Sequence, residues 1–240
     1  MRQLARAGAL VLLSALALEL AFAARIAAMR FVDPQSTSFQ RSEAWRLLTQ
    51  KGRIAWSQTW VDGARISPNL ERAVIASEDA GFIEHGGVDW DAVESAWEKN
   101  QRAEQRSVRA PRPGRAAPKV VGGSTITQQL AKNLLLSGER TLARKGQEFV
   151  LAQLLEALLS KQRILEIYLN SVEWGEGVFG AQAAAQHYYR IDASRLGVEQ
   201  AARLAVMLPA PKRFEKRPGS AYVVARAATI AARMGAVELP

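Results

Sequence analysis

Cysteine is absent from the 240-residue sequence, and histidine occurs only twice, as His85 and His187. Without cysteine the protein has no disulfide bonds, no thiolate catalysis and no cysteine-ligated metal. Two histidines are too few for a histidine-rich metal centre, and each is interpreted as a structural hydrogen-bonding residue. The chemistry of the protein must therefore rest on other side chains.

Acidic residues are also in the minority, because 23 aspartates and glutamates face 32 lysines and arginines. The resulting formal net charge of +9 favours anionic partners such as nucleic acid, anionic lipid or phosphate-bearing substrates. Hydrophobic residues make up 48% of the chain, which is typical of a globular protein. The repeated helical patterns, with no full set of strands, predict a mainly α-helical fold.

Nucleotide-binding motifs are lacking as well, since no phosphate-loop lysine motif occurs. The segment Gly175-Glu176-Gly177-Val178-Phe179-Gly180 matches the dinucleotide fingerprint. That fingerprint requires a preceding strand within a βαβ unit, whereas a helical pattern precedes it here. We therefore expect no nucleotide and no organic cofactor.

The N-terminus carries an apolar run from Ala7 to Ala24, with arginines on both sides. A membrane-spanning helix needs about 20 apolar residues, so the run is slightly short. It also contains Glu19, whose burial in lipid is costly. The alternative is a cleaved signal peptide, since Ala21-Phe22-Ala23 resembles a small-residue cleavage site. The length of the run favours an uncleaved anchor over residues 1–35.

Lysine, arginine and proline are concentrated in residues 98–119. This composition predicts a mobile, cationic loop. A solvated linker is the plainer interpretation, although a basic loop beside a membrane would be attracted to anionic head groups.

An acid pair, Glu78 and Asp79, follows an apolar helical pattern from Leu70 to Ala76. Ser67 is a suitable N-cap for this helix and Pro68 suits its first position. Carboxylates at a helix C-terminus face the negative end of the macrodipole, which raises their pKa and suits a general base. A solvated turn between two helices is the alternative.

A second candidate acid, Glu148, shares a helical stripe with Ala152, Leu155 and Leu159. An acid on an apolar stripe is costly unless it is paired or used. Four basic residues close to it in sequence could neutralise a departing pyrophosphate, although salt bridging on helix surfaces is the alternative. These residues are Lys132, Arg140, Arg144 and Lys145. If Thr141 is the N-cap of this helix, Arg140 lies just outside it.

Five motifs follow one another along the chain. They are Glu78-Asp79-x-x-Phe82-x-x-His85-x-Gly87, Gly122-Gly123-Ser124-Thr125-Ile126-Thr127-Gln128-Gln129-Leu130-Ala131-Lys132-Asn133, Arg144-Lys145-x-x-Glu148, Ile164-Leu165-Glu166-x-Tyr168-Leu169-Asn170, and Gly177-x-x-Gly180 leading to Ala184-Ala185-x-x-Tyr188-Tyr189. In this order they resemble the family 51 glycosyltransferases of bacterial cell walls, and among them the monofunctional biosynthetic peptidoglycan transglycosylases. The resemblance covers roughly residues 40–215. Two departures are Tyr189, where the family usually has phenylalanine, and the length of the basic segment.

The resemblance implies a lysozyme-like, two-lobed helical domain over residues 36–240, preceded by one transmembrane helix. It implies a hexosyltransferase that polymerises lipid II into β-1,4-linked glycan strands, with inversion and release of undecaprenyl pyrophosphate. It also implies help from Mg²⁺ or Mn²⁺ at the pyrophosphate, and inhibition by moenomycin.

Roles carried over by the resemblance fall into four groups. Glu78 matches the general base, and Glu148 matches a second glutamate near the donor pyrophosphate. The basic residues Lys132, Arg140, Arg144 and Lys145 match the cationic donor site. The residues expected to line the groove are Ser124, Thr125, Gln128, Gln129 and Asn133. The residues expected to shape the first motif are Asp79, Phe82 and His85.

The chain contains no Ser-x-x-Lys motif and no Lys-Thr-Gly or Lys-Ser-Gly triplet, so it encodes no β-lactam-binding serine site. We therefore expect a separate transpeptidase partner, together with division or elongation proteins, and no nucleic acid. The expected location is the bacterial inner membrane, with the catalytic domain on the periplasmic side. A lytic enzyme that cleaves glycan strands and a non-catalytic cell-wall scaffold remain the alternative functions.

Overall fold

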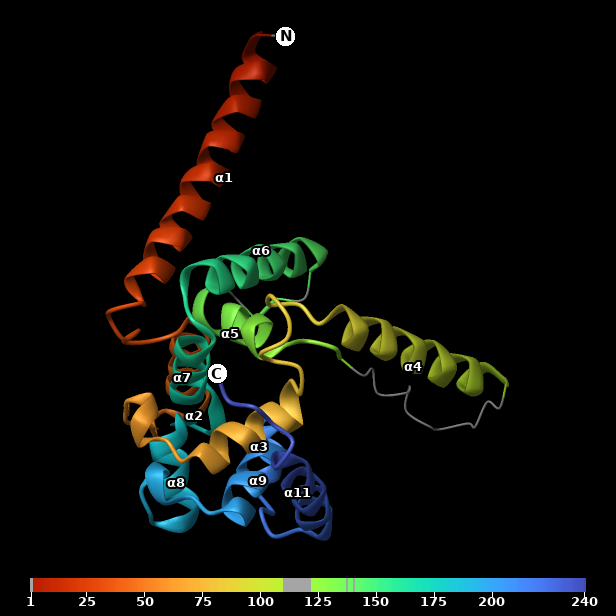
Figure 1. The fold of residues 1–240 in the computed structure, drawn as a ribbon. Helices are drawn as coiled ribbons and strands as arrows, with labels where there is room; N and C mark the ends of the chain where they lie inside the picture. Colours follow the sequence, from red (N-terminus) through yellow and green to blue (C-terminus); the bar gives the residue numbers. More distant parts are fainter. Residues whose placement is uncertain (1, 110–121, 137, 140) are drawn as a thin grey trace.

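The computed structural model describes residues 2–109, 122–136, 138–139 and 141–240, and they form a mainly helical protein as predicted (Figure 1). The α-helices are α1 (Arg2–Ala28), α2 (Ser38–Lys51), α3 (Pro68–Glu78), α4 (Trp90–Arg109), α5 (Ile126–Leu135), α6 (Leu142–Leu158), α7 (Lys161–Ser171), α8 (Ala181–Tyr189), α9 (Val198–Met207), α10 (Pro211–Phe214) and α11 (Ala221–Met234). Two short 3-10 helices are η1 (Gly63–Arg65) and η2 (Ala193–Arg195).

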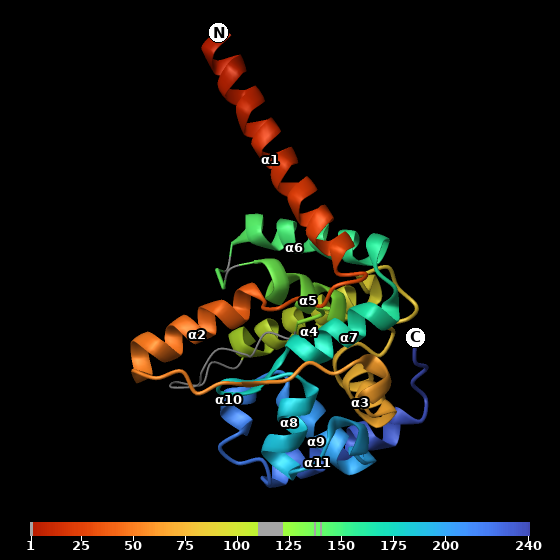
Figure 2. The same ribbon diagram turned by 90° about the vertical axis from the view of Figure 1, so that its left-hand side faces the viewer.

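Helix α1 projects away from the rest of the molecule (Figures 1 and 2). Its 27 residues are long and apolar enough to cross a membrane. Only its C-terminal end joins the core, where Ile26 is fully buried. Glu19 accepts a hydrogen bond of 2.5 Å from Gln147 of α6, so this acid has a polar partner beside the globular part of the chain.

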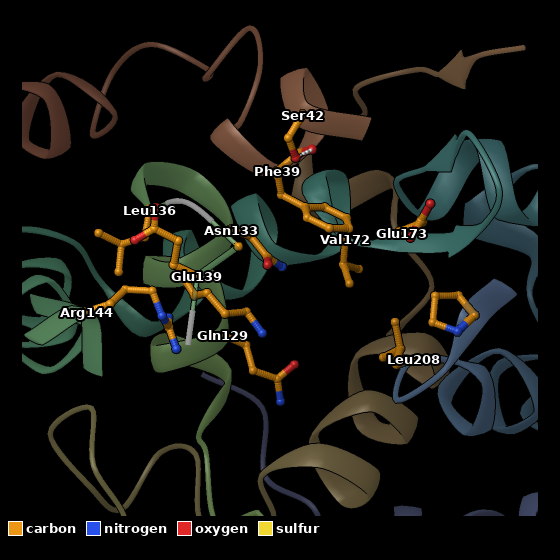
Figure 3. A pocket seen from close by; sticks show the side chains of 13 residues that line it. Phe39, Ser42, Gln129, Asn133, Leu136, Glu139, Arg144, Val172, Glu173 and Leu208 are labelled. Carbon is orange, nitrogen blue, oxygen red and sulfur yellow. Dashed lines mark hydrogen bonds between the residues drawn. The ribbon is translucent and has the colours of Figure 1, made fainter. Parts of the chain in front are cut away.

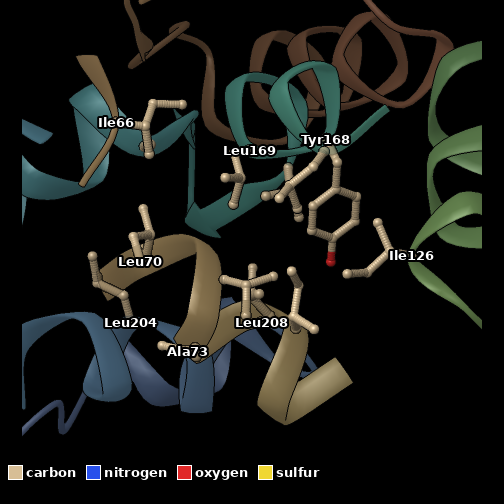
Figure 4. Packing of buried hydrophobic residues seen from close by; sticks show 14 of the residues in the cluster. Ile66, Leu70, Ala73, Ile126, Tyr168, Leu169, Leu204 and Leu208 are labelled. Atoms are coloured by element: carbon tan, nitrogen blue, oxygen red, sulfur yellow. The ribbon is translucent and has the colours of Figure 1, made fainter. Parts of the chain in front are cut away.

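The globular part contains two groups of helices (Figure 1). Helices α5 and α6 lie near the foot of α1 and α4 projects to one side, while α3 packs against α9 and α11 at the opposite end. Helix α7 runs between the two groups and contacts α5, α6 and α8. Figure 4 shows the shared core, in which Leu70 of α3, Leu204 of α9 and Tyr168 of α7 are buried together. Burial of this apolar surface fixes the relation between the two groups.

A small sheet joins β1 (Ser57–Gln58), β2 (Glu173–Gly175) and β3 (Val178–Phe179) in the order β1-β3-β2. Strand β3 pairs with β1 in parallel. Gly177 has a φ of 75°, and a Cβ there would collide with the carbonyl oxygen of Ala55. The glycines of this segment therefore build a tight hairpin against β1.

The prediction of a loop over residues 98–119 is wrong for its first half. Residues 98–109 continue helix α4, whose N-cap is formed by Asp89 accepting from the Ala92 amide at 2.8 Å. The physical reason is that alanine, glutamate, glutamine, lysine and arginine favour helices, and the first proline comes only at Pro111. The Glu98–Arg102 pair, one turn apart at 2.8 Å, adds to this preference. The remainder of the predicted loop lies outside the described residues.

Candidate active site

Glu78 is the last residue of α3, whose start is capped by Ser67 as predicted. Its carboxylate accepts hydrogen bonds from Gln129 Nε2 at 3.1 Å and Ser77 Oγ at 3.3 Å. Burial raises the pKa of Glu78, and the neighbouring charge of Asp79 adds to the rise, while the two hydrogen bonds and Arg226 oppose it. The predicted direction is confirmed, but burial rather than the helix terminus is the largest cause.

Asp79, Phe82 and His85 hold the segment after α3 in place. Asp79 accepts from the Ile126 amide at 2.9 Å through one carboxylate oxygen, and its other oxygen lies 2.8 Å from His85 Nε2. Phe82 is fully buried, with the Lys161 ammonium 4.5 Å from its ring centroid. These contacts tie the end of α3 to the start of α5, which is the shaping role expected of the three residues.

Two of the residues expected to line the groove form a helix cap. Thr125 Oγ1 accepts from the Gln128 amide at 3.1 Å and donates to the Gly87 carbonyl at 2.7 Å. Gln128 Oε1 accepts from the Thr125 amide at 3.2 Å, which completes a capping box. Both side chains are buried at the N-terminal end of α5, so Thr125 and Gln128 have a structural role, and their substrate-binding role stays a prediction.

Glu148 is buried and held between two cations of the same helix. Thr141 caps α6, which places Arg144 and Lys145 one turn before Glu148. Arg144 Nη1 lies 2.9 Å from one carboxylate oxygen, and the Lys145 ammonium contacts the other. Lys145 Nζ is also 3.4 Å from Ser124 Oγ. The predicted acid and two of its predicted bases thus form one cluster, whereas Arg140 lies outside the described residues.

Two hollows flank the end of α5. The first has a volume of about 420 Å³, and Figure 3 shows side chains from α2, α5 and α6 around it. Its lining includes four residues predicted from the motifs, namely Gln129, Lys132, Asn133 and Arg144. The second hollow, of about 470 Å³, is lined by Glu78 from α3 and by Arg213, Tyr222 and Arg226 from the C-terminal elements. Gln129 lines the first hollow and donates to Glu78 of the second, so one hydrogen bond joins the linings of the two hollows.

Several lining residues were missed by the sequence analysis. Phe39 and Glu173 reach the first hollow, and Arg213, Tyr222 and Arg226 reach the second. None belongs to one of the five motifs. The interruption of the alanine-rich pattern of α11 by an arginine was a weak signal for Arg226, which is one of two arginines in that helix.

Among the described residues, one group of three possible metal ligands comes close together, formed by Asp79, His85 and Asp89. Both oxygens of Asp79 already have hydrogen-bond partners, and Asp89 Oδ1 caps α4. The contacts of this group are those of a structural network around the first motif.

A helical domain that follows a helix long enough to cross a membrane has a half-buried glutamate beside one hollow and a glutamate–arginine–lysine cluster beside another, an arrangement suited to a transferase with an anionic leaving group. The transglycosylase family matches residues 47–235, and the chain belongs to this family, the family 51 glycosyltransferases. It is 51% identical to the biosynthetic peptidoglycan transglycosylase of Paraburkholderia phytofirmans over 233 residues, which cover 97% of this chain and 92% of that protein. It is 54% identical to the protein of the same name from Burkholderia thailandensis over 239 residues, covering 100% and 88% of the two chains.

Proposed function

We propose that the chain polymerises lipid II into β-1,4-linked glycan strands, with inversion at the anomeric carbon and release of undecaprenyl pyrophosphate. Membership of the family makes it a peptidoglycan glycosyltransferase. The observation that carries the finer proposal is the hydrogen bond between Glu78 and Gln129, which joins a hollow lined by a half-buried acid to a hollow lined by Lys132 and Arg144.

Glu78 is proposed as the general base. Its carboxylate takes the proton from the 4-hydroxyl of the acceptor sugar while that oxygen forms a bond to the anomeric carbon of the donor. The bond between this carbon and the pyrophosphate oxygen breaks on the opposite face, so the configuration inverts. A carboxylate with a pKa raised by burial is a stronger base than an exposed one, which suits proton transfer near neutral pH.

Lys132, Arg144 and Lys145 are proposed to neutralise the departing pyrophosphate. Charge develops on the leaving oxygen in the transition state, and fixed cations lower the barrier most when they need not reorganise. Glu148 supports this arrangement because its two oxygens hold Arg144 and Lys145 in defined positions. Arg140 joins the proposed cluster on the resemblance alone.

A divalent cation is proposed to bind only when the pyrophosphate of the substrate is also present. Both oxygens of Glu148 already contact cationic side chains, so this carboxylate is not a preformed metal cage. Mg²⁺ usually keeps one or two protein carboxylates and takes its other oxygens from phosphates and water. Glu148 would hold Mg²⁺ or Mn²⁺ in that way, and the ion would supply further neutralisation of the pyrophosphate.

The proposed setting is the inner membrane, with α1 as a single-pass anchor and the globular part on the periplasmic side. The helix of suitable length and composition supports the anchor. Transpeptidation would require another protein, because the chain has no β-lactam-binding serine motif.

Replacing the proposed base provides the decisive test. The purified chain incubated with lipid II should form long glycan strands that lysozyme digests, and moenomycin should block their formation. Glu78→Gln should abolish synthesis, because an amide cannot accept the proton, while the circular dichroism spectrum stays that of the wild type. The matched control is Glu71→Gln, which removes an acid from the same helix that lines neither hollow.

Three outcomes of this assay separate the possible functions. Synthesis that depends on Glu78 supports the glycosyltransferase. Shortening of preformed strands would indicate the lytic alternative. Undiminished polymerisation by Glu78→Gln would refute the role given to this residue.

A further inference from the structure

Tyr168, Gln129 and Glu78 form a continuous chain of hydrogen bonds across three helices. The Tyr168 hydroxyl on α7 donates to Gln129 Oε1 on α5 at 3.0 Å. Gln129 Nε2 in turn donates to Glu78 Oε2 on α3 at 3.1 Å. Tyr168 is 1% exposed and lies within the buried apolar cluster of Figure 4. Among the described residues, Gln129 is the one hydrogen-bond partner of the phenol oxygen.

The orientation of the Gln129 amide matters because its two ends differ chemically. The NH₂ end donates to an ionised carboxylate, whereas the oxygen end repels it. A reversed amide would therefore suit Glu78 only after Glu78 had gained a proton. Reversal would also leave the buried Tyr168 hydroxyl without an acceptor, which costs about 1–3 kcal/mol. Tyr168 thus favours the amide orientation that stabilises ionised Glu78.

We propose that Tyr168 is a positioning residue for the reaction: by fixing the amide of Gln129, it keeps Glu78 ready to accept a proton. The proposal rests on the function proposed above, in which Glu78 is the base. Tyr168 lines neither hollow, so it acts through Gln129 rather than by touching the substrate.

Other groups also face Glu78 and influence its pKa together with Gln129. Asp79 follows it in sequence, Ser77 donates to it from α3, and Arg226 approaches from α11. Burial and Asp79 raise the pKa of Glu78, while Gln129, Ser77 and Arg226 lower it. When the Gln129 amide is no longer fixed, one of the contributions that lower the pKa of Glu78 is lost. Glu78 then loses its proton only at higher pH, and the acid limb of the pH–activity profile moves to higher pH.

The test is the pH dependence of initial polymerisation rates with fluorescent lipid II, using the full-length chain in detergent. Tyr168→Phe should shift the acid limb upward by about half to one pH unit, while the plateau at higher pH stays within about twofold of wild type. A purely structural defect would instead lower the rate by the same factor at every pH. The matched control is Tyr188→Phe, which removes a hydroxyl that donates to the Trp174 carbonyl at 2.8 Å, and should leave the limb in place.

A double-mutant cycle shows whether Tyr168 acts through Gln129. Gln129→Leu alone should shift the limb upward, and adding Tyr168→Phe should shift it no further. If Tyr168→Phe does not fold, fluorotyrosine at position 168 replaces it. This analogue keeps the ring and makes the hydroxyl a stronger donor, so the limb should move to lower pH.

Two results would overturn the positioning role: a pH-independent loss of rate in Tyr168→Phe, or a shift that persists in the Gln129→Leu background. Failure of the proposed function is seen separately. In that case wild-type protein makes no polymer, or Glu78→Gln retains the activity and its acid limb.

Discussion

Glu148 illustrates how a buried charge can be tolerated in this protein. It is 3% exposed, yet two cations of its own helix contact its two oxygens. Removing one member of such a cluster leaves the others uncompensated, which is more damaging than the loss of an exposed pair. The carboxylate therefore compensates the charges of two cations on its own helix, and it also sets the positions of Arg144 and Lys145.

Glu148→Gln is expected to lower kcat/KM for lipid II by about 10- to 100-fold, because a neutral amide cannot hold both cations at the pyrophosphate. After EDTA treatment, the response of the rate to added Mg²⁺ should also weaken in this variant. Steady-state kinetics over a Mg²⁺ titration measure both effects. Glu98→Gln, which removes an exposed acid paired with Arg102, is the control and should behave as wild type. Equal kinetics in the two variants would contradict the role of Glu148.

Helix α5 depends on its N-terminal cap, and its residues reach the first hollow. Thr125→Ala removes the cap and leaves the buried Gly87 carbonyl without its donor. We expect a loss of about 2 kcal/mol in the free energy of unfolding, with specific activity at low temperature close to wild type. Thermal unfolding and initial rates measure the two quantities.

The control for this variant is Thr49→Ala, because the Thr49 hydroxyl donates to the Trp45 carbonyl on the exposed side of α2. Its stability should change by less than about 0.5 kcal/mol. A large rise in the KM of Thr125→Ala, at unchanged stability, would contradict a purely structural role and support the substrate-binding role predicted from the motif.

Helix starts were predictable because their signals are local. Ser67 and Thr141 each cap a helix at the position that their side-chain chemistry indicated. The extension of α4 was missed because the high positive charge and the later prolines outweighed good helix propensity. Arg213 and Arg226 were missed for another reason. Arg226 reaches Glu78's hollow because α11 packs against α3, and Arg213 reaches it from α10, and no local pattern encodes either placement.

We predict that α1 and α6 together set the whole molecule against the membrane. Gln147 of α6 contacts Glu19, which lies 17 residues after Arg2. At 1.5 Å per residue this interval spans about 26 Å, slightly less than the hydrocarbon core of about 30 Å. We therefore expect α6 to lie at the bilayer boundary, and its exposed side chains Leu142, Phe149 and Val150 are apolar as that position requires.

Because the chain has no cysteine, the depth of α6 relative to the membrane can be measured with single introduced thiols. A spin label on Val150→Cys, in the full-length chain in nanodiscs, should be accessible to oxygen and shielded from a water-soluble nickel reagent. The control is Tyr222→Cys, an exposed site on α11 at the other end of the molecule, where the order should reverse. Equal exposure of both labels to nickel would place α6 in water.

If α6 borders the bilayer as we predict, the contact between α1 and α6 also changes the quantity that governs the encounter of enzyme and substrate. The cationic cluster lies on α6, so the proposed lipid-linked sugar would reach Arg144 and Lys145 by lateral diffusion while its tail stays among other lipids. The search would then be two-dimensional, and the relevant concentration would be molecules per unit area of membrane. Each added sugar unit would leave the reacting end of the strand in that same plane, however long the strand extending away from it became.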